Sequence, residues 1–264
     1  MEYIGQRIPL RRLIEEPEHS LVVQSYRPRE MRSGVVNADG FGVGWYQPEV
    51  EDTPGVFTSE MPIWSDANLP QLGRKIQSSC VFAAVRSATP GMPYGQAHTQ
   101  PFAYGRYLFM HNGYITGFRE RIMRRLRERL RDEYYTAIKG GSDSEHLFAL
   151  LLEQLPPDTH GAAAMSDALS RTLGLLHDWT RELHLDALLN LAITDGEAIV
   201  TCRYSTTDYA PSLYVARADP FFPKAVVVAS EPLFANGQWE EVEAGTMLSV
   251  DTSLRITCSS LDLD

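Results

Sequence analysis

Two short apolar runs in the sequence end in polar residues of the kinds that bind a carboxylate and activate a carbonyl group. The run at 81–85 is followed directly by Arg86, and the run at 107–110 is followed, one residue later, by Asn112 and Gly113. Short apolar runs of this kind are typical of buried strands. A guanidinium group can pair with a carboxylate through two parallel hydrogen bonds, and an Asn amide with a Gly N–H can stabilise an oxyanion. Two such strands that end at the same edge would form a pocket for a small molecule that carries both a carboxylate and a carbonyl group.

Each of these residues also has an ordinary structural interpretation when it is taken alone. Asn-Gly after a strand is a frequent hairpin turn, and an Arg at a strand end commonly forms a surface ion pair. His98 lies in the Gly- and Pro-rich segment 89–100, where a single His is more commonly structural than catalytic. The functional interpretation therefore depends on these residues meeting in one pocket.

Composition and charge narrow the classes of protein to which the chain can belong. The 264 residues are 44% hydrophobic and 22% charged, as in an ordinary globular protein, and the formal net charge of −10 disfavours non-specific nucleic-acid binding. No apolar run is long enough to span a membrane, and the first residues do not have the pattern of a signal peptide. The seven histidines and the three cysteines, Cys80, Cys202 and Cys258, show no metal-ligand spacing. We therefore expect a reduced, cytoplasmic protein without a metal or cofactor, in which Cys80 and Cys202 fill the core.

The order of apolar segments predicts a layered α+β architecture in one domain that spans residues 1–264. The alternate glycines of segment 37–46 mark a strand preceded by an Asp-Gly turn. Because strand-like residues follow the glycines, a dinucleotide-binding fold, which needs a helix there, is rejected. Helices are expected at 10–15, 67–78, 117–133, 142–155 and 162–183, a polar turn at 49–55, and strands at 1–5, 80–85, 107–110, 188–194, 198–204, 212–216, 225–230 and 246–250. Strands at both ends of the chain with long helices between them favour packed layers of sheets and helices.

Asp143 has two interpretations that the residues themselves leave open. Ser142 can cap the helix at 142–155, and Asp143 and Glu145 suit its first turn because carboxylates interact favourably with the positive end of a helix dipole. Asp143 can equally point into a neighbouring pocket and bind an ammonium group. Together with Arg86 it would then suit a ligand that is an α-amino acid.

Four short motifs follow one another along the chain: Asn-Ala-Asp-Gly-Phe-Gly-Val-Gly-Trp-Tyr at 37–46, Val-Arg-Ser-Ala-Thr at 85–89, His-Asn-Gly at 111–113 and Ser-Asp-Ser-Glu at 142–145. A fifth, Ala-Ser-Glu-Pro-Leu, occupies 229–233. On these motifs the chain resembles class II glutamine amidotransferase-like proteins, and within them it is most similar to the γ-glutamyl amide hydrolases of the ergothioneine pathway. Each motif is weak alone, but the ordered set covers essentially the whole chain.

This resemblance implies a four-layer αββα sandwich of the N-terminal-nucleophile hydrolase type and a glutamyl-binding pocket. Arg86 would bind the α-carboxylate of the substrate and Asp143 its α-amino group, while Asn112 and Gly113 would form the oxyanion hole. Three further residues would lie in or beside the substrate pocket: Thr89, His98 and His111. The implied partners are a small acyl donor, glutamyl or other, and an amine or water as acceptor, with no nucleic acid and no membrane. A homodimer is one candidate assembly.

The first residue departs from the family pattern. Members of the family begin with Met-Cys, and the Cys that is exposed by removal of Met attacks the amide through its thiol while its α-amine acts as base. Alignment on Gly5 places Met1 at the position of this Cys, and residues 1–79 contain no cysteine. Because initiator Met is usually retained before a large charged residue, Glu2 predicts that Met1 stays in the mature chain. Met1 therefore becomes a candidate catalytic residue.

Three functions remain open on this sequence. The favoured one is thiol-independent acyl or amide transfer, or hydrolysis, on a small molecule in the retained pocket. Its candidate bases are the α-amine of Met1 and the side chains of Glu2, Tyr3 and His111. The second is a catalytically inactive binding or scaffold protein of the same fold, and the third is an ordinary γ-glutamyl amide hydrolase whose N-terminal Cys is absent from this sequence. Retention of all four pocket residues favours a working enzyme, because inactive relatives often lose such residues.

Overall fold

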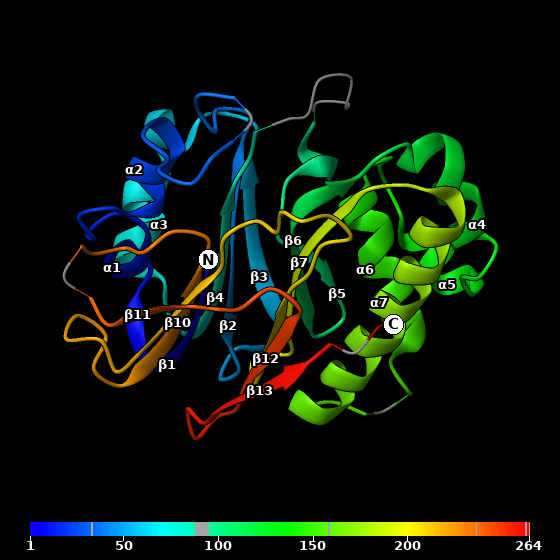
Figure 1. Ribbon diagram of the computed structural model, residues 1–264. Helices are drawn as coiled ribbons and strands as arrows, with labels where there is room; N and C mark the ends of the chain where they lie inside the picture. The colour runs from blue at the N-terminus through cyan, green and yellow to red at the C-terminus, as the bar shows by residue number, and fades with distance from the viewer. Residues whose placement is uncertain (33, 88–94, 158, 236, 262, 264) are drawn as a thin grey trace.

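Two antiparallel β-sheets pack face to face, and helices cover the outer face of each sheet (Figure 1). The computed structural model describes residues 1–264 except 33, 88–94, 158, 236, 262 and 264. The seven-stranded sheet has the order β11 (Trp239–Glu241), β9 (Tyr214–Arg217), β10 (Ala225–Ala229), β1 (Glu2–Pro9), β4 (Gln77–Val85), β2 (Phe41–Gln47) and β3 (Glu51–Ser59). The six-stranded sheet has the order β13 (Ile256–Ser260), β12 (Thr246–Val250), β8 (Ile199–Arg203), β7 (Ala187–Thr194), β6 (Tyr107–Ile115) and β5 (Phe102–Tyr104). The predicted α+β class and four-layer αββα sandwich are confirmed.

Helices form the two outer layers. Beside the seven-stranded sheet lie α1 (Arg11–Ile14), α2 (Leu21–Tyr26) and α3 (Leu69–Lys75). Beside the six-stranded sheet lie α4 (Met123–Arg127), α5 (Asp132–Ala137), α6 (Asp143–Gln154) and α7 (Ala162–Leu183). In the part of the chain that the structure describes, no helix, the 22-residue α7 included, is long and apolar enough to cross a membrane.

Alternation along the central strands explains why both faces of each sheet are covered. On β1, Tyr3 packs in the core beneath α1 and α2, whereas the next residue, Ile4, packs between the two sheets. On β4, Val81 faces the helices while Cys80 and Phe82 face the second sheet. Because successive side chains of a strand point to opposite faces, strands that are apolar at every position require an apolar layer on each side.

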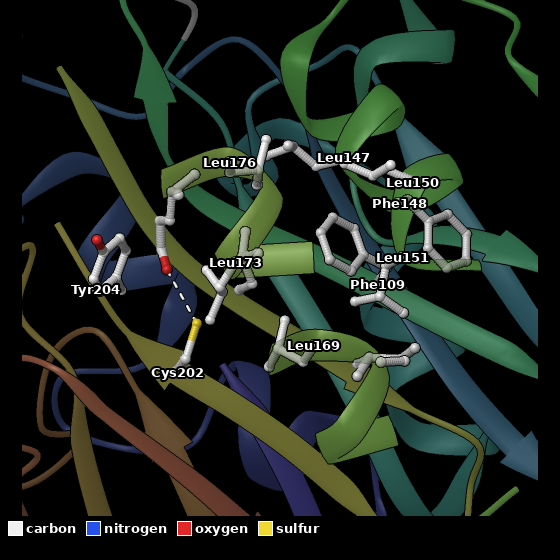
Figure 2. Packing of buried hydrophobic residues seen from close by; sticks show 14 of the residues in the cluster. Phe109, Leu147, Phe148, Leu150, Leu151, Leu169, Leu173, Leu176, Cys202 and Tyr204 are labelled. Carbon is white, nitrogen blue, oxygen red and sulfur yellow. Dashed lines mark hydrogen bonds between the residues drawn. The ribbon is translucent and has the colours of Figure 1, made fainter. Parts of the chain in front are cut away.

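The outer layer over the six-stranded sheet is held by aromatic stacking and by leucines (Figure 2). Phe109 of β6 and Phe148 of α6 stack with their ring centroids 5.2 Å apart and their planes 6° apart. Leucines from α6 and α7 fill the space around this pair: Leu147, Leu150, Leu151, Leu169, Leu173 and Leu176. This packing fixes α6 against β6, so the first residue of α6 is held close to the end of that strand.

Two helix predictions were wrong in extent. The segment 67–78 contains only the short α3, and its last residues begin β4. The segment 117–133 is not one helix, since a π-helical turn at Phe118–Ile122 precedes α4 and a further turn separates α4 from α5. The chain between α4 and α5 is fixed by Arg131. Its backbone N–H and Nε donate to the Glu153 carboxylate on α6 at 2.8 and 3.0 Å. A tertiary contact therefore overrides the local helical pattern.

The predicted polar turn at 49–55 was too long, because the turn ends at residue 50 and β3 begins at Glu51. β3 lies at the edge of its sheet, where Pro54 is tolerated because one side of an edge strand needs no hydrogen-bond donor. The sequence likewise gave no sign of β5, β11 and β13, which form the other three sheet edges.

Candidate active site

The end of β4 and the second half of β6 line a cavity of about 460 Å³, which we call the strand-end pocket. Six of the residues that the sequence singled out line it: Arg86, His98, His111, Asn112, Gly113 and Asp143. The predicted strand at 107–110 was too short, because β6 continues to Ile115 and includes Asn112 and Gly113 as paired residues. Arg86 follows β4 of one sheet, Asn112 and Gly113 belong to β6 of the other sheet, and Asp143 is the first residue of α6. Three separate elements therefore bring the predicted residues to one place. Thr89 lies outside the described residues.

The backbone of segment 37–40 positions Arg86. The N–H of Arg86 donates to the carbonyl of Gly40 at 2.9 Å, and the N–H of Asp39 donates to the carbonyl of Arg86 at 3.0 Å. Gly40 has a φ of +115°, and a Cβ at this position would lie 2.7 Å from the carbonyl oxygen of Ser59. Only glycine fits such a backbone without a shift, so the Asp-Gly of the first motif holds the strand end that carries the guanidinium.

The middle of β6 is anchored through His111 and Gln100. The side-chain amide of Gln100 donates to the carbonyl of His111 at 2.9 Å and accepts from its N–H at 2.6 Å. The His111 ring is buried, with Nε2 donating to the carbonyl of Leu188 at 2.9 Å and Nδ1 3.0 Å from Ser144 Oγ. Both ring nitrogens thus have protein partners, whereas the next residue, Asn112, is exposed to the pocket.

Asp143 links the first turn of α6 to the same strand. Ser142 caps the helix, since its Oγ accepts from the N–H of Glu145 at 3.3 Å. Asp143 is buried, and its carboxylate accepts from the N–H of Ile115 at 3.2 Å and of Ser144 at 2.7 Å. These bonds fix the Asp143 carboxylate at the wall of the strand-end pocket. Ser142 therefore caps the helix, and the adjacent Asp143 contributes to the pocket.

Met1 lies in a second cavity, of about 210 Å³, which also touches His111 and Asn112; we call it the β1-end cavity. The α-ammonium group of Met1 donates to the carbonyl of Ala83 at 3.0 Å and lies 3.9 Å from Glu2 Oε1. Burial lowers the pKa of this amine and raises the pKa of Glu2 to about 7. Both groups are therefore shifted towards their neutral forms.

The β1-end cavity lies in line with β1, between the two strands that flank it. Glu2 pairs with Phe82 of β4 and with Val228 of β10. β4 continues past Met1 and lines the cavity on one side with Ala84 and Val85, and the residues that follow β10, Ser230 and Glu231, line it on the other side. The space thus continues the path of a strand that pairs on both sides.

The three cysteines and His98 are the remaining candidates for reactive groups. Burial raises the pKa of the Cys80 and Cys202 thiols to about 12, and Cys258 is exposed on β13. None of the three lines either cavity. His98 is half-buried, and desolvation, followed by the nearby Arg86 charge, lowers its pKa. Among the described residues, no group of three or more His, Cys, Asp or Glu is arranged to hold a metal ion.

The sequence did not single out four residues of the strand-end pocket: Arg32, Gln100, Ser144 and Tyr209. Ser144 belongs to the Ser-Asp-Ser-Glu motif and Gln100 is two residues from His98, so proximity in the chain was an available signal. Arg32 and Tyr209 come from two loops that no local pattern connects. They become pocket residues only through the packing of the two sheets.

Comparison with known proteins agrees with this architecture. Residues 16–225 match the family described as glutamine amidotransferases class-II. The chain is 36% identical to the probable glutamine amidotransferase DUG3 of Saccharomyces cerevisiae over 93% of its own length and 79% of the relative. It is 29% identical to the gamma-glutamyl-hercynylcysteine sulfoxide hydrolase of Mycobacterium tuberculosis, over 98% of this chain and 95% of that one. A solved class-II domain protein of Silicibacter pomeroyi superposes with a TM-score of 0.70 at 29% identity, covering 98% of this chain and 97% of the other. The chain belongs to the class II glutamine amidotransferase family.

Proposed function

We propose that the strand-end pocket binds the γ-glutamyl part of a small-molecule amide, and that the γ-amide bond is hydrolysed or its acyl group transferred to an amine. The observation that carries this proposal is the meeting of Arg86, Asp143 and the Asn112–Gly113 pair in one cavity. A guanidinium and a carboxylate match the α-carboxylate and α-ammonium groups of a glutamyl residue. The similarity to a protein named as a gamma-glutamyl-hercynylcysteine sulfoxide hydrolase supports this substrate class.

Each pocket group has a role in this reaction. Arg86 and Asp143 hold the amino-acid end, which leaves the γ-carbonyl to reach Asn112 and Gly113. Attack on this carbonyl places a negative charge on its oxygen, and the Asn112 amide and the Gly113 N–H stabilise that charge. Collapse of the intermediate breaks the C–N bond, the amine leaves with a proton, and glutamate or a new amide remains.

Two candidates for the attacking group differ in their structural support. In a thiol-independent reaction, the buried amine of Met1 acts as the base that activates water, since its lowered pKa favours the neutral, basic form. The β1-end cavity supports the second candidate, a nucleophile carried by residues that continue β1 before Met1. In the register of Glu2 with Phe82, the third residue before Met1 would lie level with Arg86 and beside the strand-end pocket. We favour this second candidate, because it uses the space between β4 and β10 and the pairing already present.

Ligand binding tests the pocket without requiring turnover. We expect calorimetry to detect binding of glutamine that weakens at least about tenfold in Arg86→Gln, because the paired charge-assisted hydrogen bonds are lost. Arg74→Gln, an exposed change on α3, is the matched control. Absence of glutamine binding, or equal affinity in Arg86→Gln, would contradict the proposed function.

A turnover assay then distinguishes the two candidates for the attacking group. Glutamate release from γ-glutamyl amides is measured for the chain as printed and for a chain with Cys-Ala-Ala placed before Met1. A nucleophile ahead of β1 predicts turnover only with the added Cys and none with Ser-Ala-Ala at the same place. A thiol-independent reaction predicts turnover by the printed chain, reduced about 10²-fold in Asn112→Ala through loss of an oxyanion donor. Glutamine binding with turnover in neither protein would favour a binding protein.

A further inference from the structure

A third cavity, of about 400 Å³, is lined by the edge strands β3 and β5 and by helices α5 and α6; we call it the aromatic cavity. Four aromatic rings form much of its wall: Phe102 and Tyr104 of β5, Tyr134 of α5 and Phe148 of α6. A cavity of this size, with a mostly apolar and aromatic lining, is typical of a small-molecule site. The reaction proposed for the strand-end pocket uses none of these four residues.

Three of the four rings are held by contacts of their own. Phe148 stacks on Phe109 of β6 with the ring centroids 5.2 Å apart (Figure 2). Tyr104 and Tyr134 meet edge to face, with their centroids 5.3 Å apart and their planes at 72°. The Tyr134 hydroxyl also accepts a hydrogen bond from Arg131 Nη2 at 3.4 Å. Both are favourable arrangements of aromatic rings, and a wall that is already in place loses little freedom when a ligand arrives.

Thr99 adds one buried polar group to this apolar wall. It lines the cavity and is only 3% exposed, and its hydroxyl has no hydrogen-bond partner among the described residues. A buried hydroxyl without a partner is unfavourable, and a hydroxyl can serve either as donor or as acceptor. A ligand with one hydrogen-bonding group would supply the missing partner.

The other polar groups of the wall place no such demand on a ligand. Each oxygen of the Glu145 carboxylate accepts a hydrogen bond from a backbone N–H, both at 2.7 Å. Gln96 Nε2 donates to Thr58 Oγ1 at 3.1 Å, and Lys139 is exposed, so water can solvate its ammonium group. The wall therefore suits a neutral aromatic molecule, with one polar group near Thr99, better than it suits an ion.

A contiguous set of residues joins the aromatic cavity to the strand-end pocket. Thr99 lines both. The Glu145 carboxylate, in the wall of the aromatic cavity, accepts from the N–H of Gly140 in the loop that leads to Asp143. Gly140 in turn packs so closely on His98 of the strand-end pocket that a Cβ on Gly140 would lie 2.5 Å from His98 Cε1. A ligand that contacts this wall therefore also changes the surroundings of Asp143 and His98.

We propose that the aromatic cavity binds a small neutral aromatic molecule with one hydrogen-bonding group, and that its occupation changes the affinity of the strand-end pocket for its ligand. The ligand ring packs among the four aromatic side chains, and its polar group bonds the Thr99 hydroxyl. Because coupling between two binding sites is reciprocal, a ligand in the strand-end pocket changes the affinity of the aromatic cavity by the same factor. The existence of this second site does not depend on the reaction proposed for the strand-end pocket.

Indole and indene test the site by calorimetry, because they share a bicyclic ring and only indole carries an N–H group. We expect saturable binding of indole by the wild-type chain. Val56→Trp and Ala103→Trp each place a large side chain at the cavity, from β3 and β5 respectively, and each should weaken indole binding about tenfold or more. Thr99→Val removes the hydroxyl and should lower the ratio of indole to indene affinity about fivefold, as for one neutral hydrogen bond. Val50→Trp, at an exposed position outside the cavity, is the matched control and should leave both affinities unchanged.

Saturating glutamine separates the aromatic cavity from the strand-end pocket. We expect indole to bind the glutamine-saturated chain with an affinity that reaches a new constant value; a plateau at the original affinity would show that only the coupling is wrong. Indole affinity that falls without limit as glutamine rises would place both ligands in one pocket and overturn the inference. Absence of saturable indole binding would also overturn it, as would wild-type affinity in both Trp variants when circular dichroism shows that they are folded. If the chain binds indole but not glutamine, only the proposed function is wrong.

Discussion

The carbonyl oxygen of Leu188 occupies the place that a side chain on Gly113 would need. An ideal Cβ at Gly113, where φ is +150°, would lie 1.9 Å from that oxygen. The same oxygen accepts the hydrogen bond from His111 Nε2 at 2.9 Å. The part of β6 that presents Asn112 is thus held against β7 by this side-chain hydrogen bond and by a contact that only glycine permits, in addition to the pairing of the two strands.

Gly113→Ala should therefore disturb the site and the fold together. The added methyl group must push β6 away from β7, and we expect a loss of about 2 kcal/mol in the free energy of unfolding, typical of overpacking. Displacement of the Asn112 amide should also reduce glutamate release in the Cys-extended chain. Urea denaturation and turnover check the two effects. Gly174→Ala on α7 is the matched control, because a Cβ there meets nothing within 4 Å, and it should stabilise the helix by up to about 1 kcal/mol.

The sequence predicted the central strands of both sheets but not their four edges. Central strands are buried on both faces, so most of their residues are apolar, as in β7, which is buried throughout. Edge strands such as β3 are largely exposed and tolerate Pro54, so no apolar pattern marks them. The same apolar signal marks the site, because Arg86 directly follows the buried run of β4 and Asn112 lies just after the buried run within β6.

Contacts between distant loops were beyond the reach of any local pattern. Arg32 and Tyr209 meet only because Glu231 and Arg203 hold their loops from other elements. The breaks in the 117–133 segment have the same origin, since Arg131 is held by α6. The local sequence predicts neither the contact between Arg32 and Tyr209 nor the contact between Arg131 and α6.

Glu231→Ala should be strongly destabilising. Its carboxylate lies 2.5 Å from the buried His19 Nε2. It also accepts hydrogen bonds from the backbone N–H groups of Arg29 and Glu30, in the loop between α2 and β2. Removal leaves the buried His19 ring and two partly buried N–H groups without this acceptor, and we expect a loss of about 3 kcal/mol in the free energy of unfolding. Glu128→Ala, which breaks the exposed pair with Arg124, should change stability by less than about 0.5 kcal/mol. Similar values for the two variants in urea denaturation would show that Glu231 does not anchor the loop.

Thiol labelling should distinguish the buried cysteines from the exposed one. Cys80 and Cys202 are buried and their thiol pKa is raised to about 12, so almost no thiolate forms at pH 8. Iodoacetamide should add one group to the native chain, at Cys258, and three to the unfolded chain, as counted by intact mass. Alkylation at Cys258 should leave glutamine affinity unchanged, because this residue lines neither cavity. Modification of Cys80 or Cys202 in the native chain would contradict their placement in the core.

His146 should make stability fall as the pH falls below 6.5. Its Nε2 accepts from Arg127 Nε at 2.9 Å and its Nδ1 donates to the carbonyl of Ser142 at 2.7 Å, so the folded chain holds the neutral ring. Burial is the main cause that lowers its pKa from 6.5 to about 4. Between these values the unfolded chain binds the proton and the folded chain does not, so this contribution is complete above 6.5 and is lost as the pH falls towards 4. Full loss corresponds to about 3 kcal/mol.

The measurement is the difference in free energy of unfolding between wild type and His146→Gln, followed from pH 7.5 to pH 4. Because other groups titrate in both proteins, only their difference reports on this ring. The wild type should lose stability faster than the variant over this range, and His160→Gln, a change at an exposed position, is the matched control. A constant difference for His146→Gln would mean that the ring titrates normally in the folded chain, and the Arg127 hydrogen bond would then be wrong.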